Sequence, residues 1–408
     1  MTSSIPAPDF PASELPKYPM RRRCPFQVPA EYEELRNTNP VAQVRLWDNR
    51  SASLLTRYED IRAVLRSPAI SSDPKRPNFP FLSEAERVGK TQDGSFQRMD
   101  GAEHSRHRRL IIPFFTVRRM ENLRPMVREL VRQLLEELVT KPSPVDFFHE
   151  FALVVSSTVA CMLLGVPYRD HEFFQVQSAV RIDHTASTAE VEEATEKLLD
   201  YLGDLLDERT ADPRDDVMSF MAEQVASGEL TRDEAVMDAN LLLLGGHETT
   251  ANMITLGTLV LLENPEQLAR MTSKEVSVTN AVEELLRFTS ITQSNASRIA
   301  TEDIEVGGHT IPAGEGVIAA VSAANWDGTI FPEPEVLDLG RKEARQHMTF
   351  GYGVHQCVGQ ALARMELEVV FETLFDVIPG LRVAAPVDEL RFKHDSAFYG
   401  LHELPVTW

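Results

Sequence analysis

The stretch of sequence that decides the fold runs from Phe350 to Gly359 and reads FGYGVHQCVG. Its three glycines let the backbone turn tightly and approach a flat, bulky group. Cys357 falls where a helix is expected to begin, and the positive end of a helix dipole favours a thiolate. A lone cysteine in such a turn is more often a buried structural residue, but the whole decapeptide argues against that interpretation. The stretch also fails the dinucleotide-binding fingerprint, because Gln356 stands where its last glycine belongs.

The composition is that of an ordinary globular protein with a strongly acidic balance. The chain has 408 residues, 43% hydrophobic and 25% charged, with a formal net charge of −21. This acidity argues against nucleic-acid binding, which needs a basic face to neutralise phosphates. Three cysteines are too few for a disulfide framework and fit a reducing compartment. The N-terminus has no apolar signal region and no stretch approaches about 18 apolar residues, so we expect a soluble, cytoplasmic protein without a membrane segment.

The periodicity predicts a mainly α protein with a minor β part, organised as a single domain over residues 1–408. Residues 1–25 are rich in proline and are expected to be irregular. The β-rich parts are expected within residues 26–100 and 290–408, whereas residues 101–289 are mostly helical in pattern.

Short-range sequence patterns predict individual elements in the part of the chain before residue 101. Val41–Leu46 and Ser51–Arg57 read as two short strands joined by a turn, and Asp60–Leu65 as a short helix. Residues 70–100 contain three prolines and many polar side chains, so we predict a long loop there.

A long central helix is the main element of the helical part. It begins at the capping box of Thr231 and Glu234 and ends at Asn264, which gives about 30 residues and roughly 45 Å of helix. After it, Ile304–Ala320 carries hairpin chemistry and Cys357–Ile378 returns to a helical pattern.

The central helix carries an unusual polar segment, GGHETT, from Gly245 to Thr250. Two adjacent glycines inside a helix cost about 1 kcal/mol each relative to alanine. Close helix packing is one explanation. Because an acid (Glu248) and a hydroxyl (Thr249) follow, the other explanation is a local opening that admits oxygen and water. Thr250 is expected to serve packing.

Two further motifs place charged side chains one helical turn apart. Glu284 and Arg287 form an i, i+3 pair, a spacing that solvated helices also carry often. His104 and Arg108 are two cationic donors suited to a carboxylate, although a solvated basic face has the same pattern.

Together these motifs resemble the cytochrome P450 family. The decapeptide matches the haem-binding loop of that family, Phe-Gly-x-Gly-x-His-x-Cys-x-Gly, at every fixed position. The remaining motifs occur in the family's order at residues 104–108, 245–250, 284–287 and 298, and residues 399–408 resemble members from actinobacterial secondary metabolism. The resemblance implies the P450 fold, a triangular helical domain with the long central helix over the haem.

The resemblance also implies the site. Haem b would be bound with the Cys357 thiolate as axial iron ligand, a ligand that favours O–O cleavage. Glu248 and Thr249 would organise proton delivery. Glu284 and Arg287 would brace the cysteine loop, with Arg341 as a candidate third member. The residues implied to contact the haem are Phe350, Gly351, Gly359, Gly245 and Gly246, and those implied to reach its propionates are His104, Arg108, Arg298 and His355.

The implied activity is insertion of one oxygen atom of O2 into a hydrophobic small molecule. Hydroxylation of a secondary metabolite (polyketide, terpenoid or steroid-like) is expected, with oxidative rearrangement, desaturation or coupling as the alternative on the same scaffold. A non-catalytic haem protein is a remote alternative. Because no flavin or nicotinamide motif is visible, electrons are expected from a ferredoxin and a ferredoxin reductase. We expect a monomer, with a ferredoxin-docking patch at Arg106, Arg109, Arg118 and Arg119.

The family position of several segments predicts substrate contacts. These segments are residues 79–99, 170–190, Leu242–Gly246, Ile291–Asn295 and Ala397–Tyr399. His247 is a less common residue in its segment and is a candidate for substrate contact. Residues 324–328, which read ANWDG, depart from the family pattern, and we expect this to alter local packing rather than chemistry.

Overall fold

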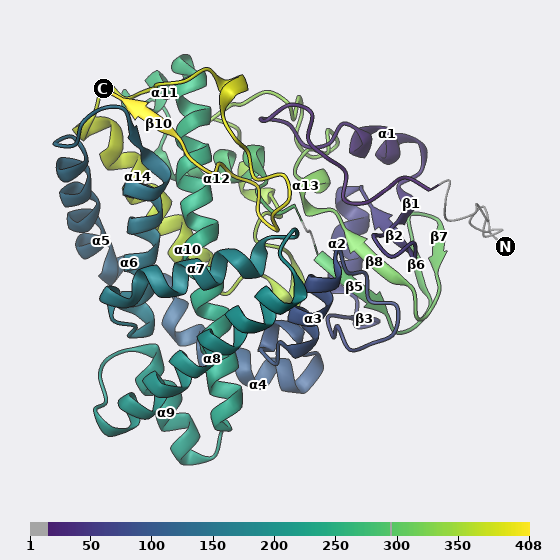
Figure 1. The fold of residues 1–408 in the computed structure, drawn as a ribbon. Helices are drawn as coiled ribbons and strands as arrows, with labels where there is room; N and C mark the ends of the chain where they lie inside the picture. The colour runs from purple at the N-terminus through teal and green to yellow at the C-terminus, as the bar shows by residue number, and fades with distance from the viewer. Residues whose placement is uncertain (1–14, 294–295) are drawn as a thin grey trace.

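The computed structural model describes residues 15–293 and 296–408. Most of its helices gather on one side of the molecule, and its main sheet lies on the other side together with the first two α-helices of the chain (Figure 1). The α-helices in these residues are α1 Glu31–Thr38, α2 Tyr58–Arg66, α3 Glu84–Gln92, α4 Gly101–Ile111, α5 Val117–Leu138, α6 Leu153–Leu164, α7 His171–Ile182, α8 Thr188–Ala211, α9 Val217–Ser227, α10 Arg232–Glu263, α11 Pro265–Thr272, α12 Val278–Thr289, α13 Val321–Ala324 and α14 Gln360–Val377.

The strands form three small sheets. The strands are β1 Val41–Arg45, β2 Ser51–Leu55, β3 Ile70–Ser71, β4 Val145–Asp146, β5 Ala296–Ala300, β6 Ile304–Val306, β7 His309–Ile311, β8 Gly316–Ala319, β9 Arg382–Val383 and β10 Pro405–Thr407. The main sheet has the order β1-β2-β8-β5-β3, and only its β2–β8 pair is parallel. The mainly α prediction with a minor β part is therefore confirmed.

The central helix α10 has 32 residues and positions the site. The predicted capping box is present in both directions: the Thr231 hydroxyl accepts from the backbone N–H of Glu234, and the Glu234 side chain accepts from that of Thr231. The helix ends at Asn264, directly before Pro265. Figure 1 shows α10 running through the helical side, where it packs against α6, α8 and α14.

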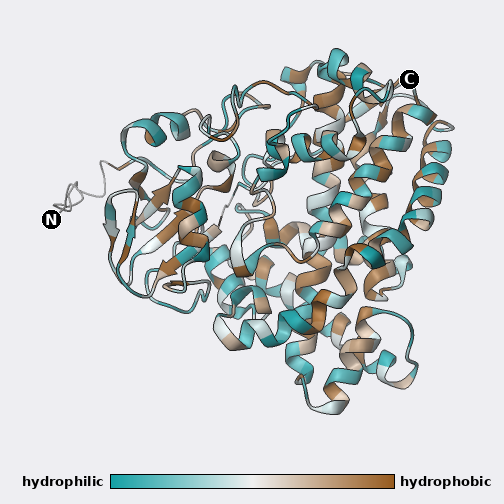
Figure 2. Ribbon diagram, turned by 180° about the vertical axis from the view of Figure 1, so that it is seen from behind, coloured by the Kyte–Doolittle hydropathy of each residue, from teal (hydrophilic) through white to brown (hydrophobic). Residues whose placement is uncertain are grey.

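Hydrophobic residues line the inner faces of the helices, and hydrophilic residues colour much of the outer surface in Figure 2. One large cluster of buried apolar side chains runs through the helical side, and a smaller one lies under the main sheet. No helix in the described ranges is long and apolar enough to cross a membrane.

Two predictions of local structure need correction. The loop predicted for residues 70–100 contains α3, whose start is capped by the Ser83 hydroxyl accepting from the backbone N–H of Glu86. This helix was missed because its buried residues are only Ala85 and Gly89, which give no apolar periodicity. The helix predicted from Cys357 begins at Gln360, so the cysteine precedes it. The predicted hairpin after Ile304 exists as β6 and β7, whereas β8 pairs with β2 and β5.

Candidate active site

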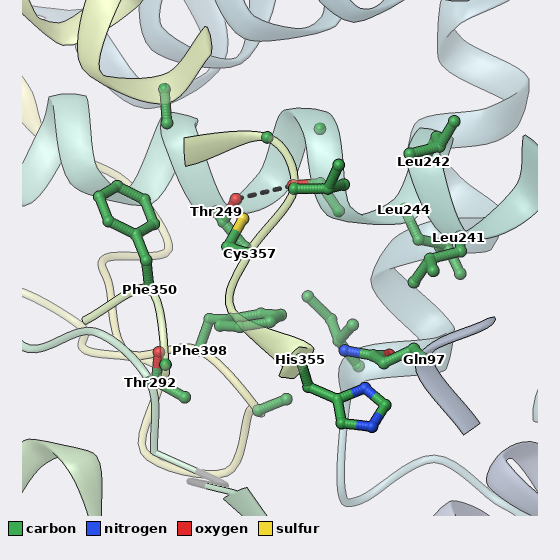
Figure 3. Close-up of a pocket in the computed structure, with 18 of the residues that line it drawn as sticks. Gln97, Leu241, Leu242, Leu244, Thr249, Thr292, Phe350, His355, Cys357 and Phe398 are labelled. Atoms are coloured by element: carbon green, nitrogen blue, oxygen red, sulfur yellow. Dashed lines mark hydrogen bonds between the residues drawn. The ribbon is translucent and has the colours of Figure 1, made fainter. Parts of the chain in front are cut away.

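A cavity of about 480 Å³ lies between α10 and the loop before α14. Figure 3 shows lining side chains from both, among them Leu241, Leu244 and Thr249 from α10 and Phe350 and Cys357 from the loop. Each segment predicted to contact substrate contributes to the lining within the described residues. Ser294 and Asn295 of the predicted set lie outside those residues.

The cysteine loop is shaped by close backbone contacts. The backbone N–H of Cys357 donates to the carbonyl of Phe350 at 2.8 Å. Gly351 and Gly353 both have a positive φ, and a Cβ on Gly353 would lie 2.3 Å from the carbonyl oxygen of Leu65. Only glycine fits there, so the loop turns as the sequence predicted and directs Cys357 to the cavity, where it is accessible despite its depth.

Opposing influences act on the Cys357 thiol. Burial raises the pKa of Cys357, whereas the backbone N–H groups of Gly359 and Gln360 and the guanidinium groups of Arg108 and Arg364 lower it. The two backbone N–H groups belong to the start of α14, the positive helix end that the sequence predicted beside Cys357. A metal cation bound to sulfur would offset the remaining cost of burial, because a coordinating thiol gives up its proton.

The four predicted propionate residues lie near one another. The rings of His104 and His355 are 4.2 Å apart between centroids, and Arg108 donates to the carbonyl of Gln356. Nε2 of His104 is buried and, within the described chain, has no partner. Nε2 of His355 lies 3.1 Å from the Ser72 hydroxyl, so this nitrogen already has a partner.

Arg298, the fourth predicted propionate residue, also lacks a charged partner among the described residues. Burial lowers the pKa of Arg298 to about 10, and the neighbouring Arg98 contributes. Among residues 15–293 and 296–408, no carboxylate forms an ion pair with it, and its guanidinium donates to the carbonyl of Ser297 at 2.8 Å. An arginine without an ion-pair partner and an imidazole nitrogen without a hydrogen-bond partner among the described residues suit the carboxylates of a haem at this end of the cavity.

The GGHETT segment does not contain the predicted local opening. α10 stays α-helical through Gly245 and Gly246. A Cβ on Gly245 would meet no heavy atom within 4 Å, whereas one on Gly246 would lie 3.3 Å from Cβ of Ala160. Gly246 therefore serves close helix packing, and Gly245 leaves room in the cavity by lacking a side chain. The Thr249 hydroxyl lines the cavity and donates to the carbonyl of Gly245 at 2.9 Å (Figure 3).

Glu248 faces away from the cavity and is paired with a cation that the sequence did not indicate. Its Oε1 lies 2.6 Å from Nζ of Lys393, and both side chains are 10% exposed. Nζ of Lys393 also donates to Oδ1 of Asn252 at 3.1 Å. Because 145 residues separate Glu248 from Lys393, no local pattern could have predicted this pair.

The prediction that His247 contacts substrate is wrong. Its side chain is fully buried, its Nδ1 lies 2.7 Å from the carbonyl of Leu243, and its ring packs edge-on against Phe174. Residues two apart in a helix point to nearly opposite sides, so His247 faces away from the side on which Gly245 and Thr249 line the cavity.

The predicted Glu284–Arg287 pair is fully buried and bidentate. Nε and Nη2 of Arg287 donate to the two carboxylate oxygens of Glu284 at 2.7 and 2.8 Å. The candidate third member is confirmed, because Nε of Arg341 donates to Glu284 at 3.1 Å. We call these three residues the buried network.

The ANWDG segment connects this network to the cysteine loop. Arg287 donates to the carbonyl of Asn325, and the Asn325 side chain accepts from the backbone N–H of Met348 and donates to the Thr349 hydroxyl. The ring of Trp326 packs on that of Phe288, with 5.5 Å between the ring centroids.

A second charged cluster under the loop was not predicted from the sequence. Glu283 accepts from Arg364 at 2.8 Å and lies 2.9 Å from Nε2 of His347. The Arg364 guanidinium stacks over the ring of Phe350 at 4.5 Å. Arg364 lies one turn into α14, and only the fold brings it to Glu283 and His347.

The predicted basic patch is smaller than expected. Arg106 pairs with Glu234 at 2.5 Å, and Arg119 pairs with Asp215 at 3.3 Å. Arg109 and Arg118 are exposed. Ile112 and Val117 are exposed beside them, at 46% and 69%, and line a second cavity that also reaches Cys357.

The fold and the site fit a haem-thiolate protein. Cys357 borders a cavity just before α14, and at one end of that cavity lie Arg298, which has no ion-pair partner among the described residues, and Nε2 of His104, which is buried without a hydrogen-bond partner there. Comparisons with known proteins give the family. The cytochrome P450 family model matches residues 28–190 and 169–377.

Close relatives cover nearly the whole chain. Cytochrome P450 GfsF of Streptomyces halstedii is 43% identical over 412 residues, which cover 100% of this chain and 99% of the relative. Pentalenic acid synthase of Streptomyces avermitilis is 45% identical over 392 residues, which cover 96% and 97%. The structure of the mycinamicin VIII C21 methyl hydroxylase MycCI from Micromonospora griseorubida matches with a TM-score of 0.91 at 40% identity, covering 97% of this chain and 100% of that one.

The chain therefore belongs to the cytochrome P450 family. It resembles members from actinobacterial secondary metabolism, and it is a monooxygenase that inserts an oxygen atom of O2 into a substrate. Family membership implies haem with a cysteine thiolate as axial ligand, and redox partners that supply electrons.

Proposed function

We propose that this P450 hydroxylates a hydrophobic secondary metabolite and that Cys357 is its axial thiolate. The observation that carries the assignment is that Cys357, of the three cysteines, borders the cavity. Cys161 is buried in α6, and burial raises its pKa to about 12. When bound, the haem would supply the chemistry that activates O2 with two electrons from the redox partners, and the Cys357 thiolate would favour cleavage of the O–O bond.

The substrate class follows from the lining near Thr249. Leu241, Leu244, Ile291 and Phe398 give this part of the cavity an apolar surface. A polyketide, terpenoid or steroid-like skeleton fits such a surface. Relatives support the class by their names, which include a mycinamicin hydroxylase, pentalenic acid synthase and a vitamin D3 dihydroxylase.

Thr249 and Glu248 would supply protons in succession. Two protons are needed for one oxygen atom to leave as water, so a relay must reach the cavity. The Thr249 hydroxyl is at the cavity surface and can exchange its bond to Gly245 for one to a ligand. Glu248 lies behind it on the same helix, and Lys393 holds its carboxylate in place.

Electrons would enter from the side of Ile112 and Val117. The second cavity reaches Cys357 there, and Arg109 and Arg118 offer positive charge to an acidic ferredoxin reduced by a ferredoxin reductase. The protein would act as a monomer in the cytoplasm. Reversing both charges (Arg109→Glu with Arg118→Glu) should weaken ferredoxin binding and reduce its salt dependence; unchanged binding contradicts this docking surface.

Isotope labelling tests the proposed reaction. The protein is combined with ferredoxin, ferredoxin reductase, NADH and ¹⁸O₂, with vitamin D3 and mycinamicin VIII as probes. Hydroxylation predicts products that carry one labelled oxygen atom. Products without the label would support desaturation or rearrangement instead, and would contradict hydroxylation.

A further inference from the structure

One arginine of the cavity lining, Arg181, forms no ion pair with any carboxylate among the described residues. Among the described residues, five lysines and arginines line the cavity: Lys90, Arg98, Arg108, Arg181 and Arg298. Lys90 is paired with Glu86 at 2.5 Å, and Arg98 with Asp93 at 3.2 Å. Arg108 and Arg298 lie at the end assigned to the haem propionates. For Arg181, neither a haem propionate nor a carboxylate of the described residues has been assigned as a partner.

Arg181 lies at the end of α7, next to the central helix. Its Nη1 donates to Oδ1 of Asn240 on α10 at 3.0 Å. In the part of the chain that the structure describes, it forms no ion pair with a carboxylate. The carboxylate of Asp93 acts on it electrostatically, but Asp93 already accepts from Arg98 and from the backbone N–H of Ser95.

Both side chains retain donors for a ligand. The Arg181 guanidinium has five N–H donors, and one is used by Asn240. Because Oδ1 of Asn240 accepts that bond, its amide nitrogen is the group left to donate, and no described residue accepts from it. Asn240 is 2% exposed and Arg181 is only partly accessible, so a ligand would meet both away from bulk water.

The missing partner has the chemistry of an anion. Burial lowers the pKa of Arg181, although its guanidinium still carries its proton at neutral pH. A partly buried charge without a counter-ion is unfavourable, and a carboxylate relieves that cost through charge-assisted hydrogen bonds. The planar fork of arginine matches the two oxygens of a carboxylate.

We propose that this enzyme accepts apolar substrates that carry a carboxylate, and that Arg181 and Asn240 bind that carboxylate. The inference rests on the proposed monooxygenation and specifies its substrate class. Asn240 precedes Thr249 by nine residues on α10, about 13 Å along the helix at about 1.5 Å per residue. The oxidised carbon should therefore lie far from the carboxylate, near the other end of a long apolar skeleton.

Paired probes test the proposal by binding. Dodecanoate and dodecan-1-ol have the same chain and differ in the charged group. Their dissociation constants are measured on the haem-loaded protein by calorimetry and by the shift of the haem Soret band. The wild-type protein should bind dodecanoate roughly ten-fold or more tightly than the alcohol, because hydrogen bonds to charged groups contribute this much.

Variants assign the preference to Arg181. Arg181→Gln should lower the ratio of acid to alcohol affinity by about ten-fold, and Arg181→Lys should restore part of it. Arg382→Gln, which changes an exposed arginine on β9, is the matched control and should leave the ratio unchanged.

Equal affinities for acid and alcohol in the wild-type protein, or no binding of either, would overturn the proposal. An unchanged ratio in Arg181→Gln would overturn it as well. Neither result touches the proposed function, which is tested separately by the carbon monoxide spectrum and by ¹⁸O₂ incorporation. A wild-type protein without the carbon monoxide band, or without labelled oxygen in its products, would contradict the proposed function instead.

Discussion

The two sides of the cavity differ in how their buried charges are satisfied. Below the cysteine loop, Glu284 is matched by Arg287 and Arg341, and Glu283 by Arg364 and His347. On the side formed by α7 and α10, Arg181 has an amide as partner and, in the described residues, no paired carboxylate.

We call the side below the cysteine loop the scaffold side, because its buried charges are paired within the protein. The side formed by α7 and α10 has an arginine that is free to bind a ligand. A buried charge with all its hydrogen bonds satisfied fixes one geometry, which suits a loop that must hold an iron ligand. A guanidinium away from water that lacks a carboxylate is costly, because it keeps its proton at neutral pH, and a ligand that carries a carboxylate relieves that cost. Changes on the scaffold side should therefore affect stability most, and changes near the cavity should affect coupling or binding.

The largest effect is expected from Arg287→Met. It removes the bidentate partner of Glu284 and leaves the buried carboxylate with Arg341 as its one remaining paired cation among the described residues, which should cost about 3–5 kcal/mol. Denaturant unfolding and haem content measure the loss. Arg391→Met is the control, because Arg391 pairs with Glu403 at the surface and should change stability by less than about 1 kcal/mol. Equal midpoints for the two variants would contradict the scaffold role.

The cluster of Glu283, His347 and Arg364 should make the free energy of unfolding depend on pH. Burial raises the pKa of Glu283, but the hydrogen bonds from His347 and Arg364 outweigh this and lower it to about 2. Because this pKa is below the unfolded value of 4.5, the stabilisation is present above pH 4.5 and is lost as the pH falls towards 2.

Arg364→Met tests this dependence. It should reduce the free energy of unfolding at neutral pH by on the order of 2 kcal/mol, and the difference from wild type should shrink between pH 5 and pH 2. A difference that is constant over this range would exclude Glu283 as its source.

On the cavity side, Thr249→Ala should leave the fold and haem intact but uncouple electron use from product. Product formed per NADH should fall roughly ten-fold or more, with release of peroxide, because a positioned proton donor is lost. Thr258→Ala is a matched control: Thr258 makes the same kind of bond, to the carbonyl of Ile254, in a part of α10 that does not line the cavity. Normal coupling in Thr249→Ala would remove Thr249 from the relay.

The smallest effect is expected from Lys393→Met. Glu248 would lose the cation that holds its carboxylate, so coupling should fall by a few-fold. Lys393→Arg keeps the charge and should retain most of the coupling. If both variants behaved like wild type, the ion pair would have no part in proton delivery.

The sequence predicts what local patterns encode. The glycines around Cys357, the capping box of α10 and the pair Glu284 with Arg287 all rest on residues within a few positions of each other, and the structure has each of them. The short hairpin strands before α2 were also predicted within two residues of their ends.

What the sequence did not predict depends on the fold. Lys393 reaches Glu248, and Arg364 reaches Glu283, only because distant segments pack together. Arg181 gives no signal in the sequence, since no local pattern shows that the fold leaves it without an ion pair among the described residues. α3 was missed because it is short and polar, so tertiary contacts rather than periodicity define it.

The central claim, that Cys357 is the thiolate ligand of a haem, is tested most directly by one spectrum. The purified protein is reduced, and its absorption is recorded with and without carbon monoxide. A strongly red-shifted Soret band in the wild-type protein, absent in Cys357→Ser, is the predicted result. A band typical of histidine-ligated haem in the wild-type protein, or no haem band, would contradict the assignment.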